Sequence, residues 1–150
     1  MTNEPIDPDV ESGAQRLEIN QTPGLVLFAI AAGGGLGSLA RWSLSEALPN
    51  DSFPWATFLT NVTGSFLIGV LLVLVSYRFT EQKYLRPFFG VGFLGGFTTF
   101  STYTEQTVSM INDGSFELAI GYVVATLIAA LFAVSLGTRL TRLALKGATR

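Results

Sequence analysis

The chain of 150 residues is 49% hydrophobic and only 13% charged, with a formal net charge of −2. Soluble domains typically carry about 25% charged residues, so this composition favours an all-α membrane protein. Cysteine and histidine are absent, which excludes thiol chemistry, disulfides and imidazole metal ligands. The mild net charge and the lack of a basic patch in the sequence argue against nucleic acid as a partner.

Residues 1–22 are predicted to form a disordered acidic tail, because five acidic residues stand there against the single Arg16. A secretory signal peptide is not expected, since its first residues would be basic and its apolar stretch would come earlier. The remaining residues, 23–150, are predicted to form one four-helix transmembrane domain.

Four long windows without Asp, Glu, Lys or Arg predict four membrane spans, because a spanning helix needs roughly 20 mostly apolar residues. The predicted spans cover residues 25–44, 55–77, 87–111 and 118–140. Of the 9 Lys and Arg residues, only Arg41 lies on the side away from the termini. The positive-inside rule therefore predicts a multi-pass protein of the cell membrane with both termini in the cytoplasm.

The first two spans carry small and polar residues on defined faces. Glycines between Gly33 and Gly37 predict a helix-packing face, since small residues let helices approach closely in lipid. In the second span, Thr57, Asn61 and Ser65 recur every four residues and share one face. Two interpretations of Asn61 remain open: its amide pairs with another helix, or its two N–H donors bind a dehydrated anion.

The third span is badly suited to one unbroken helix, because its glycine cluster is followed at once by hydroxyl residues and aromatic rings over Gly92–Tyr103. Non-helical backbone at membrane depth requires protein, water or an ion to satisfy its polar groups. The sequence therefore predicts a helix broken at a Gly-rich centre. Its freed carbonyls suit a hard cation such as Na⁺, and the ring edges of Phe100 and Tyr103 suit an anion. Ordinary packing is the simpler interpretation of the rings.

The fourth span is apolar apart from a few residues, of which Tyr122 and Thr126 share one face. No window contains a buried carboxylate, which is the usual mark of a proton-coupled transporter. No nucleophile–base pair is visible either, so the chain is predicted not to be an enzyme. Passive conduction through neutral donors is favoured.

Three motifs together resemble the Fluc (CrcB) family of fluoride channels: the Gly-rich run ending at Arg41-Trp42, the stretch from Pro54 to Ser65, and the run from Gly95 to Tyr103. The resemblance implies a passive, fluoride-selective channel that exports cytoplasmic fluoride and lowers its toxicity. It also implies an antiparallel dual-topology dimer with a structural, non-transported Na⁺ at its centre.

The resemblance also implies roles for single residues. Backbone carbonyls of Gly95 and Thr98 would hold the Na⁺. The fluoride pathway would consist of Asn61, Thr57, Phe100, Tyr103, Tyr122 and Thr126. The chain departs from the family pattern at three places: Tyr103 stands where phenylalanine is usual, Gln106 where glutamate is usual, and Ala130 where a serine can occur.

Three alternatives accompany this interpretation. The one-sided distribution of Lys and Arg fits one half of an obligate heterodimer with an oppositely oriented homologue, because a dual-topology chain should have balanced flanks. A small dual-topology exporter of the multidrug type has a similar size, but it needs a membrane-embedded carboxylate. A non-conducting assembly subunit needs only the packing glycines and leaves the Asn61 and Phe100 motifs unexplained.

Overall fold

The computed structural model describes residues 23–48, 53–79 and 82–147, and this part of the chain contains helices and no strands. The elements are α2 (Pro23–Ala47), α3 (Trp55–Tyr77), the π-helical η1 (Arg86–Leu94), α4 (Gly95–Phe97), α5 (Ser101–Asn112) and α6 (Phe116–Gly147). The acidic tail expected over residues 1–22 lies outside the described residues.

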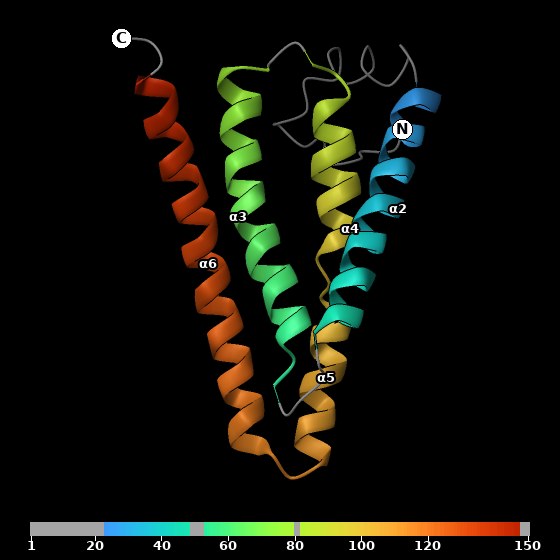
Figure 1. Ribbon diagram of the computed structural model, residues 1–150, viewed down its shortest axis with the longest axis vertical. Coiled ribbons are helices and arrows are strands. Elements are labelled where there is room, and N and C mark those ends of the chain that lie inside the picture. The colour runs from blue at the N-terminus through green and yellow to red at the C-terminus, as the bar shows by residue number, and fades with distance from the viewer. Residues whose placement is uncertain (1–22, 49–52, 80–81, 148–150) are drawn as a thin grey trace, which may run out of the picture.

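Three helices are long and apolar enough to cross a membrane: Gly24–Ala47, Trp55–Tyr77 and Phe116–Lys146. The protein is therefore an all-helical, multi-pass membrane protein. The segment expected to be the third span differs from the others, because η1, α4 and α5 divide it into pieces that are each shorter than a span. Its course is still nearly continuous, and α5 continues the direction of η1 and α4 (Figure 1).

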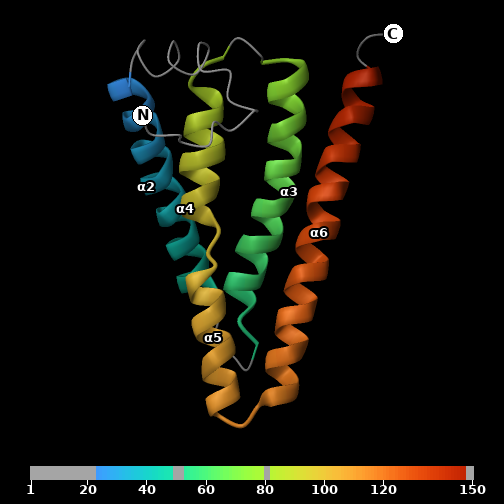
Figure 2. The ribbon, with the colours of Figure 1, turned by 180° about the vertical axis from the view of Figure 1, so that it is seen from behind.

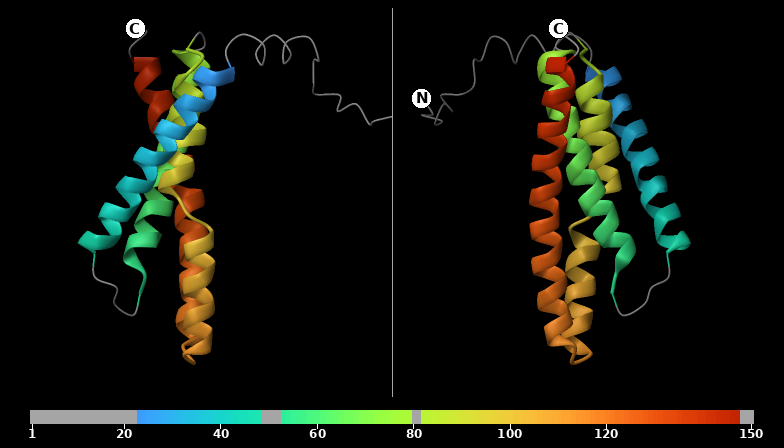
Figure 3. Two further views of the ribbon diagram at one scale, coloured as in Figure 1. Left: turned by 90° about the vertical axis from the view of Figure 1, so that its right-hand side faces the viewer. Right: turned by 60° about the vertical axis from the view of Figure 1, so that its left-hand side comes forward.

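The helices run side by side along the long axis of the molecule (Figures 1 and 2). The start of α2 and the end of α6 lie at the same end, and the turn between α5 and α6 lies at the opposite end. Gly114 makes this turn with a φ of 78°, a left-handed conformation that glycine adopts without strain. Figure 3 shows α5 and α6 as a hairpin, with the lower ends of α2 and α3 leaning away from it.

Glycines bring α2 directly against η1 and α4, which confirms the predicted packing role of the first glycine run. A Cβ atom added at Gly33 would meet the backbone of Phe88, and one added at Gly37 would meet the backbone of Phe93. From the other side, Gly96 faces the backbone of Gly34. Close backbone approach of this kind replaces the hydrophobic effect as the driving force for helix association in lipid.

The second close pair is α3 with α6, where the same device is used. Gly69 of α3 faces the backbone of Val134, and Gly137 of α6 faces the backbone of Phe66. The outer face of α6 is different, since Ile128 and Phe132 are more than half exposed. Large exposed apolar side chains suit a surface that meets lipid or another protein.

Candidate functional site

The predicted break in the third segment is present, but it falls directly after the glycines and not among them. Gly95 and Gly96 are still helical, and the chain leaves the helix at Thr98, whose φ and ψ are −82° and 158°. Helical structure resumes at Ser101. Gly96 packs closely against the Gly34 backbone while it is still helical, so this glycine does not break the helix. The helix ends because of the residues that follow.

Asn61 of α3 clamps the broken backbone at Thr99. Its Nδ2 donates to the Thr99 carbonyl at 3.0 Å, and its Oδ1 accepts from the Thr99 N–H at 2.9 Å. The amide therefore pairs with another helix, as one of the two interpretations of Asn61 predicted. An asparagine amide has two N–H donors, so one donor lies outside this pair.

The Thr99 hydroxyl caps the start of α5. It accepts from the Thr102 backbone N–H at 3.2 Å and donates to the Thr102 hydroxyl at 3.1 Å. A helix start leaves several N–H groups without partners, and a threonine side chain satisfies one of them. Sequence reasoning did not single out Thr99. The sequence feature that could have identified this cap is the position of Thr99 three residues before Thr102, within a run of hydroxyl residues.

Two backbone carbonyls at the break have unusual surroundings. In a continuous helix the Thr99 N–H would bond to the Gly95 carbonyl, but here that N–H is directed to Asn61. The Thr98 carbonyl accepts from Nη1 of Arg41 at 3.2 Å. Arg41, which belongs to α2, is thus a structural partner of the break. The carbonyl oxygens of Gly95 and Thr98 are ligands of the kind that hard cations take.

A groove of about 460 Å³ opens beside the break, between α3 and α6. Six of the eight predicted site residues line it: Asn61, Gly95, Thr98, Phe100, Tyr103 and Thr126. The rest of the wall is mostly apolar and includes Ile68, Leu94 and Leu127. No Asp, Glu, Lys or Arg lies among the described residues of the wall.

Thr57 and Tyr122, the other two predicted residues, do not line the groove and are buried behind it. Tyr122 is fully buried, and its hydroxyl donates to Oε1 of Gln106 at 3.2 Å. Its ring lies 5.2 Å from that of Tyr103, which in turn lies 5.8 Å from Phe100. The three rings form a row from the groove into the protein, and Gln106 fixes its inner end.

The hydroxyl of Thr126, in α6, makes no hydrogen bond within the described part of the chain. The residue is only 6% exposed, and its Oγ1 is buried without a hydrogen-bond partner among the described residues. An unsatisfied buried hydroxyl costs about 1–3 kcal/mol. Thr126 lines the groove, but its Oγ1 is itself covered, so this unpartnered donor lies beneath the groove wall and not on its surface.

The fold and the groove together define the class: a small helical membrane protein with a groove of neutral residues beside a broken helix. Comparison with known proteins gives the family. Residues 28–138 match the family described as CrcB-like protein, Camphor Resistance (CrcB), and the chain belongs to it.

Curated relatives of the chain are similar over most of their length. A protein of Nocardia farcinica named "Fluoride-specific ion channel FluC 2" is 49% identical over 127 residues, which cover 83% of this chain and 91% of the relative. "Fluoride-specific ion channel FluC 1" of Mycolicibacterium paratuberculosis is 44% identical over 118 residues, 77% of this chain and 89% of the relative. The protein of the same name from Streptomyces coelicolor is 42% identical over 128 residues, 84% and 83% of the two chains.

Proposed function

We propose that the chain is a passive, fluoride-selective ion channel and not an enzyme, in line with the names of its relatives. The observation that carries the proposal is a groove wall of neutral residues, with the unpartnered hydroxyl of Thr126 buried beneath it. Phe100 lies on the same wall and is 78% exposed. A hydroxyl donates to an anion, and the edge of an aromatic ring is its electropositive part.

Fluoride is small and strongly hydrated, so a pore must replace its water with other donors. The second N–H of Asn61, the Thr126 hydroxyl and the ring edges of Phe100 and Tyr103 supply a series of neutral donors. Selective conduction requires binding strong enough for entry and weak enough for release, spread over several sites. A narrow track of small donors excludes chloride by size.

The proposed direction of net flow is outward across the cell membrane. A negative interior drives an anion out, with about 2.3 kcal/mol per charge for each 100 mV. HF that enters a less acidic cytoplasm releases fluoride there. A passive channel then suffices to lower the concentration of cytoplasmic fluoride, and no coupling ion is needed.

The proposed assembly is an antiparallel dual-topology dimer, in which η1, α4 and α5 together serve as the fourth membrane crossing. Two features support a second subunit. The groove is open on one side, and Phe100 projects from it with most of its surface exposed. A second copy in the opposite orientation closes the groove and covers the ring. The fluoride path then lies between subunits.

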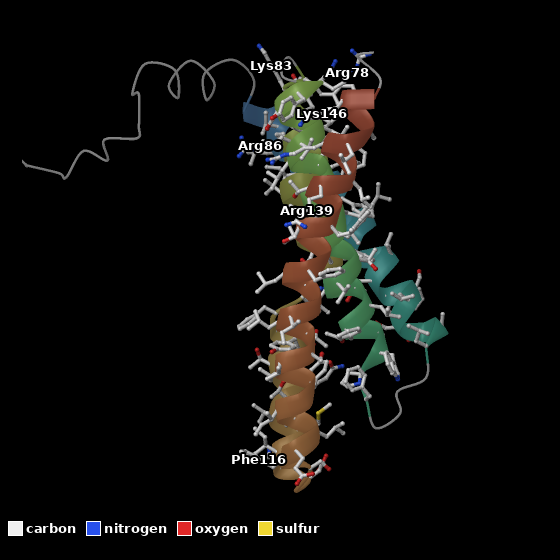
Figure 4. All side chains as sticks on the ribbon, turned by 90° about the vertical axis from the view of Figure 1, so that its left-hand side faces the viewer. Arg78, Lys83, Arg86, Phe116, Arg139 and Lys146 are labelled. Carbon is white, nitrogen blue, oxygen red and sulfur yellow. The ribbon has the colours of Figure 1, made fainter. Side chains whose placement is uncertain are left out.

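A heterodimer with an oppositely oriented homologue is the second candidate for the partner. The specific observation is that the Lys and Arg residues labelled in Figure 4 all lie toward one end of the molecule, away from Phe116. The positive-inside rule favours a single orientation for such a chain. A partner with the opposite charge bias then supplies the inverted subunit.

A structural Na⁺, not transported, is proposed to bind the carbonyls of Gly95 and Thr98. The freed Gly95 carbonyl and the absence of carboxylates on the groove wall fit a hard monovalent ion. When bound, the ion supplies a positive charge that ties two broken helices together. Arg41 donates to the Thr98 carbonyl and so helps to hold it in place. Replacing Na⁺ with a large organic cation throughout purification should reduce the dimer fraction in gel filtration, and an unchanged fraction would contradict this role.

A small multidrug-type exporter is the weakest alternative. Such an exporter needs a carboxylate at membrane depth to bind protons and cationic drugs. The described groove wall contains none, and its polar groups are donors suited to an anion. The same donors argue against a non-conducting assembly subunit. In such a protein the unpartnered Thr126 hydroxyl would lower the stability without serving a function.

The test is fluoride efflux from liposomes that contain the purified chain alone, followed with a fluoride electrode, with chloride efflux as the control. Fast efflux of fluoride only is the expected result. If the chain alone is silent but conducts when co-expressed with an oppositely oriented homologue, the heterodimer is correct. Silence in both preparations, with the protein folded and inserted, refutes the channel.

A further inference from the structure

Six cations from separate parts of the sequence come together at one end of the molecule. They lie at the end of α3, near the start of η1 and in the last turns of α6: Arg78, Lys83, Arg86, Arg139, Arg142 and Lys146. Figure 4 shows most of them at the end opposite Phe116. They are dispersed along the chain, but the predicted topology already placed them on one side of the membrane.

The cations of α6 share one helix face. Arg139, Arg142 and Lys146 follow the spacing i, i+3, i+7, and all three are exposed. Gly137 marks the opposite face, because it packs against the Phe66 backbone of α3. At about 100° per residue, Arg139 points roughly 200° away from Gly137 around the helix axis. The three residues, here called the α6 cation stripe, therefore face away from α3.

The α6 cation stripe lies at the depth of the lipid headgroups. The span Phe116–Lys146 has 31 residues. Such a helix is about 46 Å long, whereas the hydrocarbon core is about 30 Å thick. The charge-free residues 118–138 fill that core, so the helix from Arg139 onward runs out through the headgroup layer. Arg139 and Lys146 are about 10 Å apart along the axis.

A row of leucines runs beside the stripe. Leu136, Leu140 and Leu143 are 37%, 48% and 65% exposed and follow the spacing i, i+4, i+7. The same side of α6 thus offers cations at headgroup depth and an adjoining apolar strip that reaches into the core at Leu136. That combination fits a ligand with an anionic head and an apolar tail better than it fits a wholly polar ligand.

We propose that the α6 cation stripe binds anionic phospholipids, with the phosphate on the arginines and an acyl chain along the leucines. A guanidinium matches a phosphate through two parallel hydrogen bonds, and juxtamembrane cations attract anionic lipid headgroups. The other end of the hairpin carries Asp113 and Glu117 and repels such lipids. This proposal does not depend on fluoride conduction.

The experiment is native mass spectrometry of the full-length chain in detergent, titrated with phosphatidylglycerol or with phosphatidylcholine of the same acyl chains. Phosphatidylglycerol is expected to bind more tightly. The triple variant Arg139→Gln, Arg142→Gln, Lys146→Gln should lower its affinity about a hundredfold, since each cation near the surface contributes roughly fivefold. Arg139→Lys with Arg142→Lys is the matched control, and it should keep most of the affinity because the charges remain.

Several results would overturn the proposal. Equal affinity of the two lipids, or an unchanged affinity of the triple variant, shows that the stripe does not recognise anionic lipid. Full competition by inorganic phosphate at the same concentration assigns the site to a free anion. Loss of the dimer mass in the triple variant, without loss of lipid from the remaining monomer, assigns the stripe to the subunit interface. Tryptophan emission of each variant establishes that it is folded.

Discussion

Replacing Asn61 by leucine, which has a similar size and no hydrogen-bonding group, tests the clamp on the broken helix. The change removes both hydrogen bonds to Thr99 and leaves a backbone N–H and a carbonyl without partners. Thr99 is only 9% exposed, so water from the open groove can replace no more than part of these bonds. Each unsatisfied group costs about 1–3 kcal/mol, which gives an expected destabilisation of about 2–4 kcal/mol.

The measurement is the melting temperature in detergent, followed by the emission of the two tryptophans, together with fluoride efflux from liposomes. A fall of roughly 5–15 °C and the loss of fluoride efflux are expected. Ser65→Ala is the matched control, because Ser65 lines the same groove but donates only to the Asn61 carbonyl in its own helix. Asn61→Asp keeps an acceptor for the Thr99 N–H, so it should melt between the other two variants and still not conduct fluoride.

A leucine variant that melts within about 2 °C of the unmodified protein and conducts fluoride normally would refute this reasoning. The break would then be held by other contacts, such as the bond from Arg41 to the Thr98 carbonyl. A variant that melts normally but no longer conducts would indicate that Asn61 is a donor for fluoride and that it is not needed to hold the break.

Three further predictions use the same two measurements. Thr126→Val removes the unpartnered hydroxyl, so stability should stay equal or rise by about 1 kcal/mol while fluoride efflux falls, and Thr126→Ser should conduct normally. Gly37→Ala should destabilise the protein by about 1–3 kcal/mol or more, because the new methyl group meets the backbone of Phe93. Gly35→Ala, which has open space around it, should be tolerated, and equal melting of the two alanine variants would contradict the packing role. Phe100→Ile should leave the melting of the monomer unchanged, because the ring is mostly exposed, and should abolish fluoride efflux; normal efflux would remove Phe100 from the pathway.

Helix positions were predictable from the sequence because a membrane imposes a simple rule on composition. The second predicted span, 55–77, has the same bounds as α3, and α6 extends beyond the predicted 118–140 at both ends. The extra length of α6 carries charged residues, which a rule based on apolar windows necessarily leaves out. The predicted break lies a few residues before the observed one, because the sequence does not distinguish glycines that allow close packing from glycines that break a helix.

The site was less predictable, since its decisive contacts join residues far apart in the sequence. Asn61 and Thr99 are separated by 38 positions, so the sequence alone left two roles open for the amide. Gln106 was visible only as a departure from the family pattern, and its bond to Tyr122 appears only when α5 and α6 pack together. Thr57 and Tyr122 share faces with groove residues, yet helix spacing does not say how deeply a face is buried.

The proposed sites for Na⁺ and fluoride both depend on the break in the helix. The helical stretch before it ends in carbonyls, and α5 after it begins with N–H groups, so opposite partial charges meet within a few residues. Arg41 lies at the carbonyl side, where the proposed Na⁺ would also bind. Phe100, Tyr103 and Thr126 line the groove next to the start of α5, where the proposed fluoride path passes. A continuous helix would pair both sets of groups internally, so the clamp by Asn61 keeps exposed the groups on which the proposed ion sites depend.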